Sequence, residues 1–107
     1  MCDNPRYILY QSAYDALVAN KAAQPKTEKV TIAGKCCESG DLIGENMPIQ
    51  HCEVGDTIAV CATGAYNYSM SSNYNRLQKP AVVFVKDSTD RIVVKRETLD
   101  DLVRNDI

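Results

Sequence analysis

The sequence predicts a mainly β domain, a small Greek-key-like β-barrel or sandwich with short helices. Short runs rich in β-branched residues alternate with turn residues along much of the chain, a spacing that is typical of barrels and sandwiches. With 107 residues, 45% of them hydrophobic and 24% charged, the chain is long enough to form one hydrophobic core and has the composition of a globular protein.

Strand-like segments follow one another after the first quarter of the chain. Residues 29–33 alternate between polar and apolar side chains and stop at Gly34, as an amphipathic strand does. Further segments with strand composition are 41–43, the edge-like 47–49, 57–62, 80–86 and 91–95. The tetrad Asp87-Ser88-Thr89-Asp90 separates the last two segments, which predicts an antiparallel hairpin.

Three other segments are less regular. Residues 10–22 fit either a helix, through the spacing of Tyr10, Tyr14, Leu17 and Val18, or a strand over 15–20. Thr98, with Asp101 three residues later, predicts the cap of a short helix over 98–104. Residues 66–76 are polar and aromatic without a period, which predicts a loop of the kind that carries function more often than packing.

The overall charge and hydropathy exclude some classes of partner. A net charge of −2 gives no electrostatic reason to expect binding to nucleic acid or to an anionic membrane. No apolar run approaches the roughly 20 residues that span a bilayer, and the first residues do not have the pattern of a signal peptide. We therefore expect no nucleic-acid partner and no membrane partner.

Cysteine is present five times, at positions 2, 36, 37, 52 and 61. An odd number favours free thiols in a reducing cytoplasm over a disulfide framework. Four of these cysteines together with His51 could supply soft metal ligands, but zinc-site spacings and the two-spacer redox motif are both absent. We therefore predict no metal site, and we expect Cys61, inside a predicted strand, to be a buried apolar thiol.

The stretch K-C-C-E-S-G-D, residues 35–41, places carboxylates beside a thiol. Glu38 and Asp41 flank a Ser-Gly turn, and neighbouring carboxylates disfavour the thiolate form of a cysteine. A cysteine in such surroundings is better suited to donating a proton than to acting as a standing nucleophile. The alternative is an ordinary solvated turn after a strand, and these residues alone favour that alternative.

Two further stretches have binding chemistry. Residues 64–75, G-A-Y-N-Y-S-M-S-S-N-Y-N, offer many neutral hydrogen-bonding groups, which suit a phosphate or an amino-acid ligand; a surface loop anchored by its tyrosines is the alternative. In D-N-P-R-Y-I-L-Y, residues 3–10, Arg6 and Tyr10 would converge on one anion if they shared a helical turn. An exposed arginine over an aromatic ring explains that pair more simply.

In their order and spacing, these stretches and the Gly55-Asp56 turn resemble the C-terminal domain of the fold type III PLP-dependent decarboxylases, in particular those that act on diaminopimelate. The resemblance runs from the first residues to about Lys95. Family members join an N-terminal β/α barrel, with the Schiff-base lysine and a glycine-rich phosphate site, to a C-terminal β-domain. The resemblance implies that residues 1–107 are the second of these domains, without the barrel.

The resemblance also implies roles for individual residues. The family's active-site motif C-E-S-x-D, presented across a dimer interface to the partner's barrel, falls on Cys37-Glu38-Ser39 with Asp41 as its last member. Cys37 would then be the catalytic proton donor near the substrate α-carbon, whereas Cys36 would serve packing. The implied substrate contacts are Arg6, Tyr10, Glu38 and Tyr66, and Tyr66 would also reach the phosphate of the cofactor.

The activity implied by the resemblance is conversion of meso-2,6-diaminopimelate to L-lysine and CO2 in lysine biosynthesis. The enzyme would be a cytoplasmic homodimer with pyridoxal 5'-phosphate bound mainly by the barrel. Arg6 and Glu38 complement the distal zwitterion of diaminopimelate, while the related ornithine and arginine decarboxylases have aspartate after the cysteine. Because this chain lacks the Schiff-base lysine, we expect it to be inactive alone.

Two departures and two alternatives remain. Tyr7 follows Arg6 where the family commonly has proline, and residues 97–107 have no family signature. One alternative is another decarboxylase of the same fold, acting on carboxynorspermidine, ornithine or arginine. The other is a free-standing β-barrel module that binds a small ligand.

Overall fold

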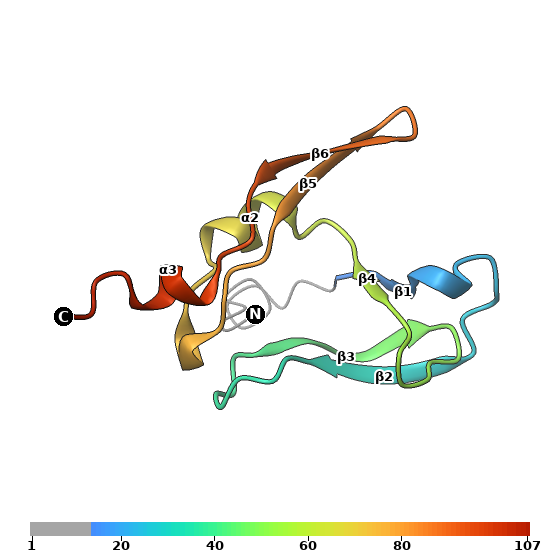
Figure 1. Ribbon diagram of the computed structural model, residues 1–107. Helices are drawn as coiled ribbons and strands as arrows, with labels where there is room; N and C mark the ends of the chain where they lie inside the picture. The colour runs from blue at the N-terminus through green and yellow to red at the C-terminus, as the bar shows by residue number, and fades with distance from the viewer. Residues whose placement is uncertain (1–13) are drawn as a thin grey trace. The chain divides into compact units, whose positions relative to one another are not determined.

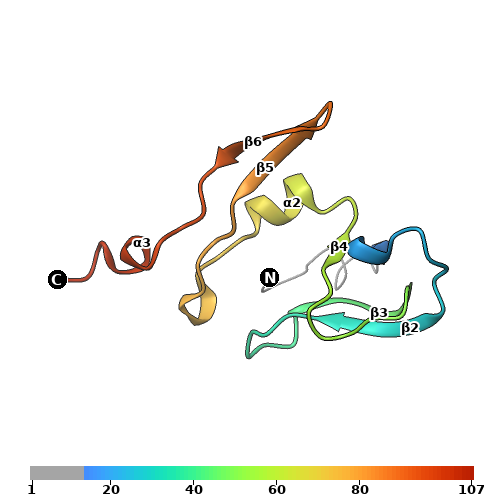
Figure 2. The same cartoon turned by 45° about the vertical axis from the view of Figure 1, so that its right-hand side comes forward.

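The structure is a computed structural model that describes residues 14–107 (Figures 1 and 2). The chain divides into two compact units, one ending at Met70 and the other formed by Ser71–Ile107. Within the described residues the strands pair into three separate two-stranded antiparallel sheets and do not close into a barrel. The predicted class, mainly β with short helices, is confirmed.

The first unit contains two of these sheets. Strand β1 (Ala16–Val18) pairs with β4 (Ile58–Val60), and β2 (Glu28–Ala33) pairs with β3 (Leu42–Ile49). A turn of 3-10 helix, η1 (Ala19–Lys21), follows β1 directly. Of the two predictions for this segment, the strand is therefore correct.

The core of this unit lies between β1 and β3. Its buried members are Tyr14, Ala16, Val18, Met47 and Ile49. On both strands the buried residues are two positions apart, because successive side chains of a strand point to opposite faces. Val18 and Ile49 are the largest side chains that are fully buried, and burial of a side chain of this size contributes about 1.5–3 kcal/mol.

Strand β3 is continuous, whereas the sequence predicted two pieces separated at Gly44. The pairing shifts between Val30 opposite Met47 and Ile32 opposite Gly44, so β3 contains one residue more than β2 at this point. Asn46 has a φ of 53° in this bulge. Pro48 lies opposite Lys29 within the strand, and it is tolerated because a two-stranded sheet leaves β3 an outer edge that needs no N–H donor.

Two predictions in the region after β3 are wrong. Strand β4 has only three residues, and Ala62, with a φ of 57°, turns the chain soon after Val60. Cys61 therefore lies beyond the strand and is exposed, not buried as predicted. Part of the predicted loop 66–76 is helical, because helix α2 (Gly64–Ser69) closes through backbone bonds such as that from Asn67 N to Thr63 O at 3.0 Å.

The second unit begins with a short 3-10 turn, η2 (Tyr74–Arg76), and continues as a hairpin of β5 (Val82–Lys86) and β6 (Thr89–Val94). The hairpin is confirmed with a tighter turn than predicted, because only Asp87 and Ser88 connect the strands. Both residues have positive φ, 50° and 59°, as a two-residue type I′ turn requires.

Helix α3 (Leu99–Val103) ends the second unit, and its predicted cap is confirmed. The Thr98 side chain accepts a hydrogen bond from Asp101 N, and the Asp101 side chain accepts one from Thr98 N, which completes a capping box. Among the described residues, no helix is long and apolar enough to cross a membrane.

Candidate functional site

The C-E-S-x-D stretch lies in the loop that connects β2 to β3, residues 34–41. Figure 1 shows this loop at one end of the β2–β3 hairpin, with η1 near the other end. Gly34 N donates to Asp41 O at 2.9 Å, which extends the antiparallel ladder beyond the pair Ala33 and Leu42. Cys37 and Glu38 are therefore neighbours near the tip of a closed hairpin loop.

The side chains of this loop differ in exposure. Cys37 is exposed and not disulfide-bonded, Glu38 is half-buried, and Asp41 is 4% exposed. Inside the loop, Glu38 N donates to Cys36 O at 2.9 Å and Asp41 N to Glu38 O at 3.3 Å. The loop thus presents a thiol outward and holds a carboxylate inward.

Cys36 corrects the expectation of free thiols throughout the chain. It is disulfide-bonded, whereas Cys37, Cys52 and Cys61 form no disulfide bond. Of the two adjacent cysteines in the loop, only Cys37 has a thiol with a proton to give.

Tyr66 lies on helix α2, a different element of the same unit, and its side chain is 46% exposed. The next residue, Asn67, is 8% exposed, and among the described residues neither its Nδ2 nor its Oδ1 has a hydrogen-bond partner. A buried amide without partners is costly. Its amide is therefore a buried polar group whose hydrogen-bonding capacity no described residue uses.

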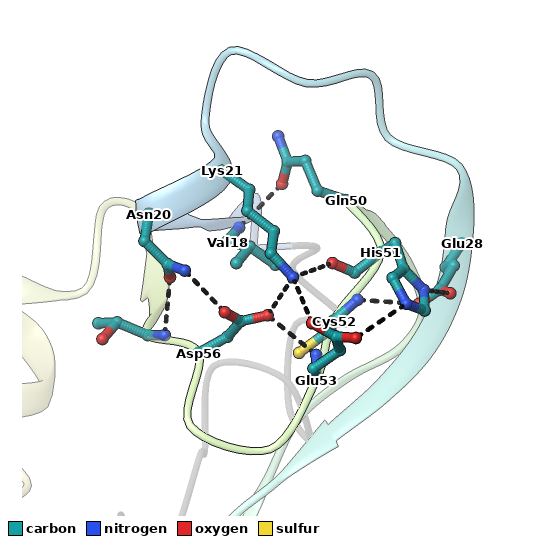
Figure 3. A network of polar contacts seen from close by, with 10 residues as sticks. Val18, Asn20, Lys21, Glu28, Gln50, His51, Cys52, Glu53 and Asp56 are labelled. Atoms are coloured by element: carbon teal, nitrogen blue, oxygen red, sulfur yellow. Dashed lines mark hydrogen bonds and ion pairs between the residues drawn. The ribbon is translucent and has the colours of Figure 1, made fainter.

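A separate polar network closes the other end of the first unit (Figure 3). Asp56 accepts hydrogen bonds from Lys21 Nζ at 2.7 Å, Asn20 Nδ2 at 2.7 Å and Glu53 N at 2.9 Å. The Lys21 ammonium, followed by Asn20, holds the pKa of Asp56 well below its ordinary value. Asp56 itself raises the pKa of Lys21, so the network fastens the turn before β4 to η1.

His51 and Glu28 form an ion pair beside this network, and Glu28 also accepts from Cys52 N at 3.3 Å. The pair raises the pKa of His51 and lowers that of Glu28. Ion pairs between structural elements explain these shifts without a catalytic role. Among residues 14–107 there is also no group of three or more His, Cys, Asp or Glu side chains that could hold a metal ion.

The predicted site residues thus fall into three groups. Cys37 and Glu38 lie together on one loop, Tyr66 lies on α2, and Arg6 and Tyr10 lie outside the described residues. The convergence of these groups on one ligand stays a prediction. Sequence reasoning overlooked Asn67 and gave Asp41 no role, because burial of a polar side chain leaves no local sequence signal.

Comparison with known proteins identifies the family. Residues 1–64 match the model of the family described as pyridoxal-dependent decarboxylase, C-terminal sheet domain. The chain belongs to this family. Its match covers the C-E-S-x-D loop and ends at the first residue of α2.

Relatives with the same domain are similar along the whole chain. The chain is 49% identical over 107 residues to the diaminopimelate decarboxylase of Bacillus subtilis and 50% identical over 106 residues to that of Synechocystis. These matches cover 100% and 99% of the chain but only 24% and 23% of the relatives. The chain therefore spans about a quarter of the length of the relatives it matches.

Solved structures agree with this assignment. The diaminopimelate decarboxylase of M. jannaschii in complex with L-lysine superposes with a TM-score of 0.81 at 34% identity, covering 98% of this chain and 24% of that one. The Helicobacter pylori enzyme, also complexed with L-lysine, gives 0.78 at 33% identity, covering 96% and 25%. The sheet-domain fold is thus shared with enzymes several times longer.

Proposed function

We propose that residues 1–107 are the C-terminal β-domain of a diaminopimelate decarboxylase, whose N-terminal β/α barrel is not part of this chain. The complete enzyme would convert meso-2,6-diaminopimelate to L-lysine and CO2. The observation that carries the proposal is the loop 34–41, which presents the exposed Cys37 thiol beside Glu38. The names of the relatives, and the lysine in two related structures, support this substrate and product.

One residue of α2 fits a contact with pyridoxal 5'-phosphate. Tyr66 is exposed and can donate its hydroxyl proton to a phosphate oxygen. When bound, the cofactor supplies the electron sink for loss of the carboxylate. The lysine and most of the phosphate site would come from the barrel.

Cys37 would complete the reaction by delivering a proton. The bond between the α-carbon and the leaving carboxylate breaks, CO2 departs, and a new C–H bond forms with the proton of the thiol. Solvent then returns a proton to the thiolate. The exposure of Cys37 suits a group that must reach a substrate atom outside its own domain.

Glu38 would select the substrate by binding the distal ammonium group of diaminopimelate. Arg6 and Tyr10, which lie outside the described residues, would bind the distal carboxylate. Ornithine and arginine have no such carboxylate, so this set of charges discriminates against them. In a cytoplasmic homodimer, the loop would reach the barrel of the partner subunit.

The test uses the complete enzyme, with the N-terminal barrel restored and pyridoxal 5'-phosphate supplied. CO2 release is measured from meso-diaminopimelate, ornithine, arginine and carboxynorspermidine. We expect the wild-type enzyme to release CO2 only from diaminopimelate. Cys37→Ala should lower kcat by a factor of about 10²–10⁴, and Glu38→Gln should lose diaminopimelate turnover. Cys61→Ala, which removes another exposed thiol, is the matched control and should keep wild-type activity.

Preference for another substrate would refute the assignment to diaminopimelate. A rate of CO2 release that neither Cys37→Ala nor Glu38→Gln changes would refute the roles of Cys37 and Glu38. The isolated chain should release no CO2 above contaminant level.

A further inference from the structure

The loop 34–41 has eight residues between two paired strands, and contacts within the loop fix its conformation together with the disulfide bond of Cys36. Its ends are joined by the bond from Gly34 N to Asp41 O at 2.9 Å. Its middle is joined to its first half by the bond from Glu38 N to Cys36 O at 2.9 Å. Cys37 lies between the two residues of that second bond.

The buried side chain of Asp41 bonds across the loop to the backbone of Cys36. Asp41 is 4% exposed, and its Oδ2 accepts a hydrogen bond from Cys36 N at 2.8 Å. A hydrogen bond to a carboxylate is stronger than one between neutral groups. The backbone of Cys36 is therefore held on both sides, by the Asp41 carboxylate at its N–H and by Glu38 at its carbonyl oxygen.

Gly34 provides the space that this carboxylate occupies. A Cβ atom added to Gly34 would lie 2.0 Å from Asp41 Oδ2, 2.2 Å from Oδ1 and 2.3 Å from Cγ. These separations are far below contact distance, so no residue other than glycine fits while Asp41 keeps its position. Gly34 and Asp41 form a matched pair: the missing side chain of Gly34 leaves the space that the Asp41 carboxylate fills.

We infer that Asp41 is a positioning residue, which fixes the backbone of Cys36 and thereby aims Cys37 and Glu38 at the substrate. Its carboxylate is buried and acts on the loop through Oδ2. The catalytic part of this inference rests on the function proposed above for Cys37 and Glu38, whereas the structural part does not.

The structural part is tested by the reactivity of the Cys37 thiol in the complete, PLP-loaded enzyme without substrate. Iodoacetamide labelling at Cys37 is followed by peptide mass spectrometry, which separates it from Cys52 and Cys61. We expect Asp41→Ala to change the labelling rate of Cys37 but not that of Cys61, and Asp41→Asn to stay near wild type, because its side-chain oxygen can still accept from Cys36 N. An unchanged rate in Asp41→Ala would overturn the inference.

A double-mutant cycle tests the pairing of Gly34 with Asp41. Gly34→Ala should lower the melting temperature of the enzyme when Asp41 is present, because the Asp41 carboxylate must move away from Cys36 N. It should have little effect in the Asp41→Ala background, because all three clashing atoms are then gone. Gly64→Ala, where an added Cβ meets no atom within 4 Å, is the control for alanine in place of glycine. Additive effects of the two substitutions would contradict the pairing.

The catalytic part is tested by kcat for diaminopimelate. Asp41→Ala should lower kcat by about a hundredfold, the cost of misplacing a catalytic group by about 1 Å, and Asp41→Asn should restore most of it. In a Cys37→Ala background the same substitution should lower kcat by a smaller factor, because only the part of the effect that acts through Glu38 is left. Asp56→Ala, which opens a turn elsewhere, should leave kcat unchanged once the enzyme is folded.

Two results separate this inference from the proposed function. An equal loss of kcat with and without Cys37 would overturn the positioning of Cys37 by Asp41 while leaving the decarboxylase intact. A wild-type enzyme that does not turn over diaminopimelate, but whose Cys37 labelling depends on Asp41, would refute the proposed function and support the structural role of Asp41.

Discussion

The two units of the chain hold themselves together in different ways. All the buried apolar side chains of the described residues lie in the first unit, around Val18 and Ile49. In residues 71–107 no residue is buried, and the hairpin exposes Val83, Phe84, Val85 and Ile92 by 44% to 74%. The first unit thus has a core of its own, whereas the second presents its apolar side chains to its surroundings.

Polar contacts give the second unit its local order. Glu97 accepts from Lys79 N at 2.8 Å and from Asn73 Nδ2 at 2.6 Å, and its carbonyl oxygen accepts from Gln78 Nε2 at 2.8 Å. No described residue buries the apolar side chains of the hairpin, and exposed apolar surface of this kind is typical of interaction sites. The isolated chain is therefore expected to self-associate.

The largest effect should come from truncating the core of the first unit. Ile49 is 1% exposed, and Ile49→Ala should lower the local opening free energy of β3 by about 2–5 kcal/mol. Ile92→Ala makes the same chemical change on a side chain that is 60% exposed, and should cost less than about 1 kcal/mol in β6. Hydrogen exchange of residues 1–107 alone, where no further domain can cover the hairpin, reports both strands. Equal losses of opening free energy from Ile49→Ala and Ile92→Ala would show that Ile92 is covered, and would contradict the difference between the two units.

A smaller effect is expected from the polar network of the first unit. Asp56→Ala removes the acceptor for Asn20, Lys21 and Glu53 N at once, and should lower the melting temperature less than Ile49→Ala but more than the loss of a helix cap. Asp56→Asn can still accept hydrogen bonds and should fall in between. A melting temperature unchanged by Asp56→Ala at neutral pH would show that the network does not contribute to the stability of the first unit.

In the second unit the corresponding polar feature is the capping box of α3. Thr98→Ala removes the acceptor for Asp101 N, and should cost about 1 kcal/mol in the opening free energy of that helix. Thr98→Ser keeps the hydroxyl and is the matched control. Protection of α3 that is insensitive to Thr98→Ala would mean that other contacts, not its cap, hold this helix.

The features that could be predicted from the sequence are local ones. The alternation over 29–33, the turn after Lys86 and the Thr98–Asp101 spacing each specify an element through neighbouring residues, and each element forms. The prediction that Cys61 is buried was wrong, because it depended on where β4 ends. The chain turns away at Ala62 through a positive φ, which no sequence pattern indicates.

The candidate site was predictable to a similar extent. The residue types of C-E-S-x-D, together with the family resemblance, indicated Cys37 and Glu38 without any structure. The contact of Asp41 with Gly34 was not predictable, because it joins residues seven positions apart through the space left by a missing Cβ. The isolated amide of Asn67 was equally hidden, because the other residues of α2 are exposed and the sequence has no apolar stripe there.

The smallest effect should be a pH dependence from the pair of Glu28 and His51. The raised pKa of His51 adds stability that is fully present below its ordinary value of 6.5 and is lost as the pH rises through the raised pKa. The lowered pKa of Glu28 adds stability that is present above its ordinary value of 4.5 and is lost as the pH falls through the lowered pKa. The pair therefore stabilises most between these two ordinary values.

We expect His51→Gln to lower the melting temperature of the complete enzyme slightly at about pH 6 and not at about pH 9. The His51 side chain is 62% exposed, so solvent and salt screen the pair and the difference should shrink at high ionic strength. Glu28→Gln removes the other partner and should give the same pH dependence. A difference that grows toward pH 9 would mean that His51 stabilises the first unit as a neutral ring, through packing and not through charge.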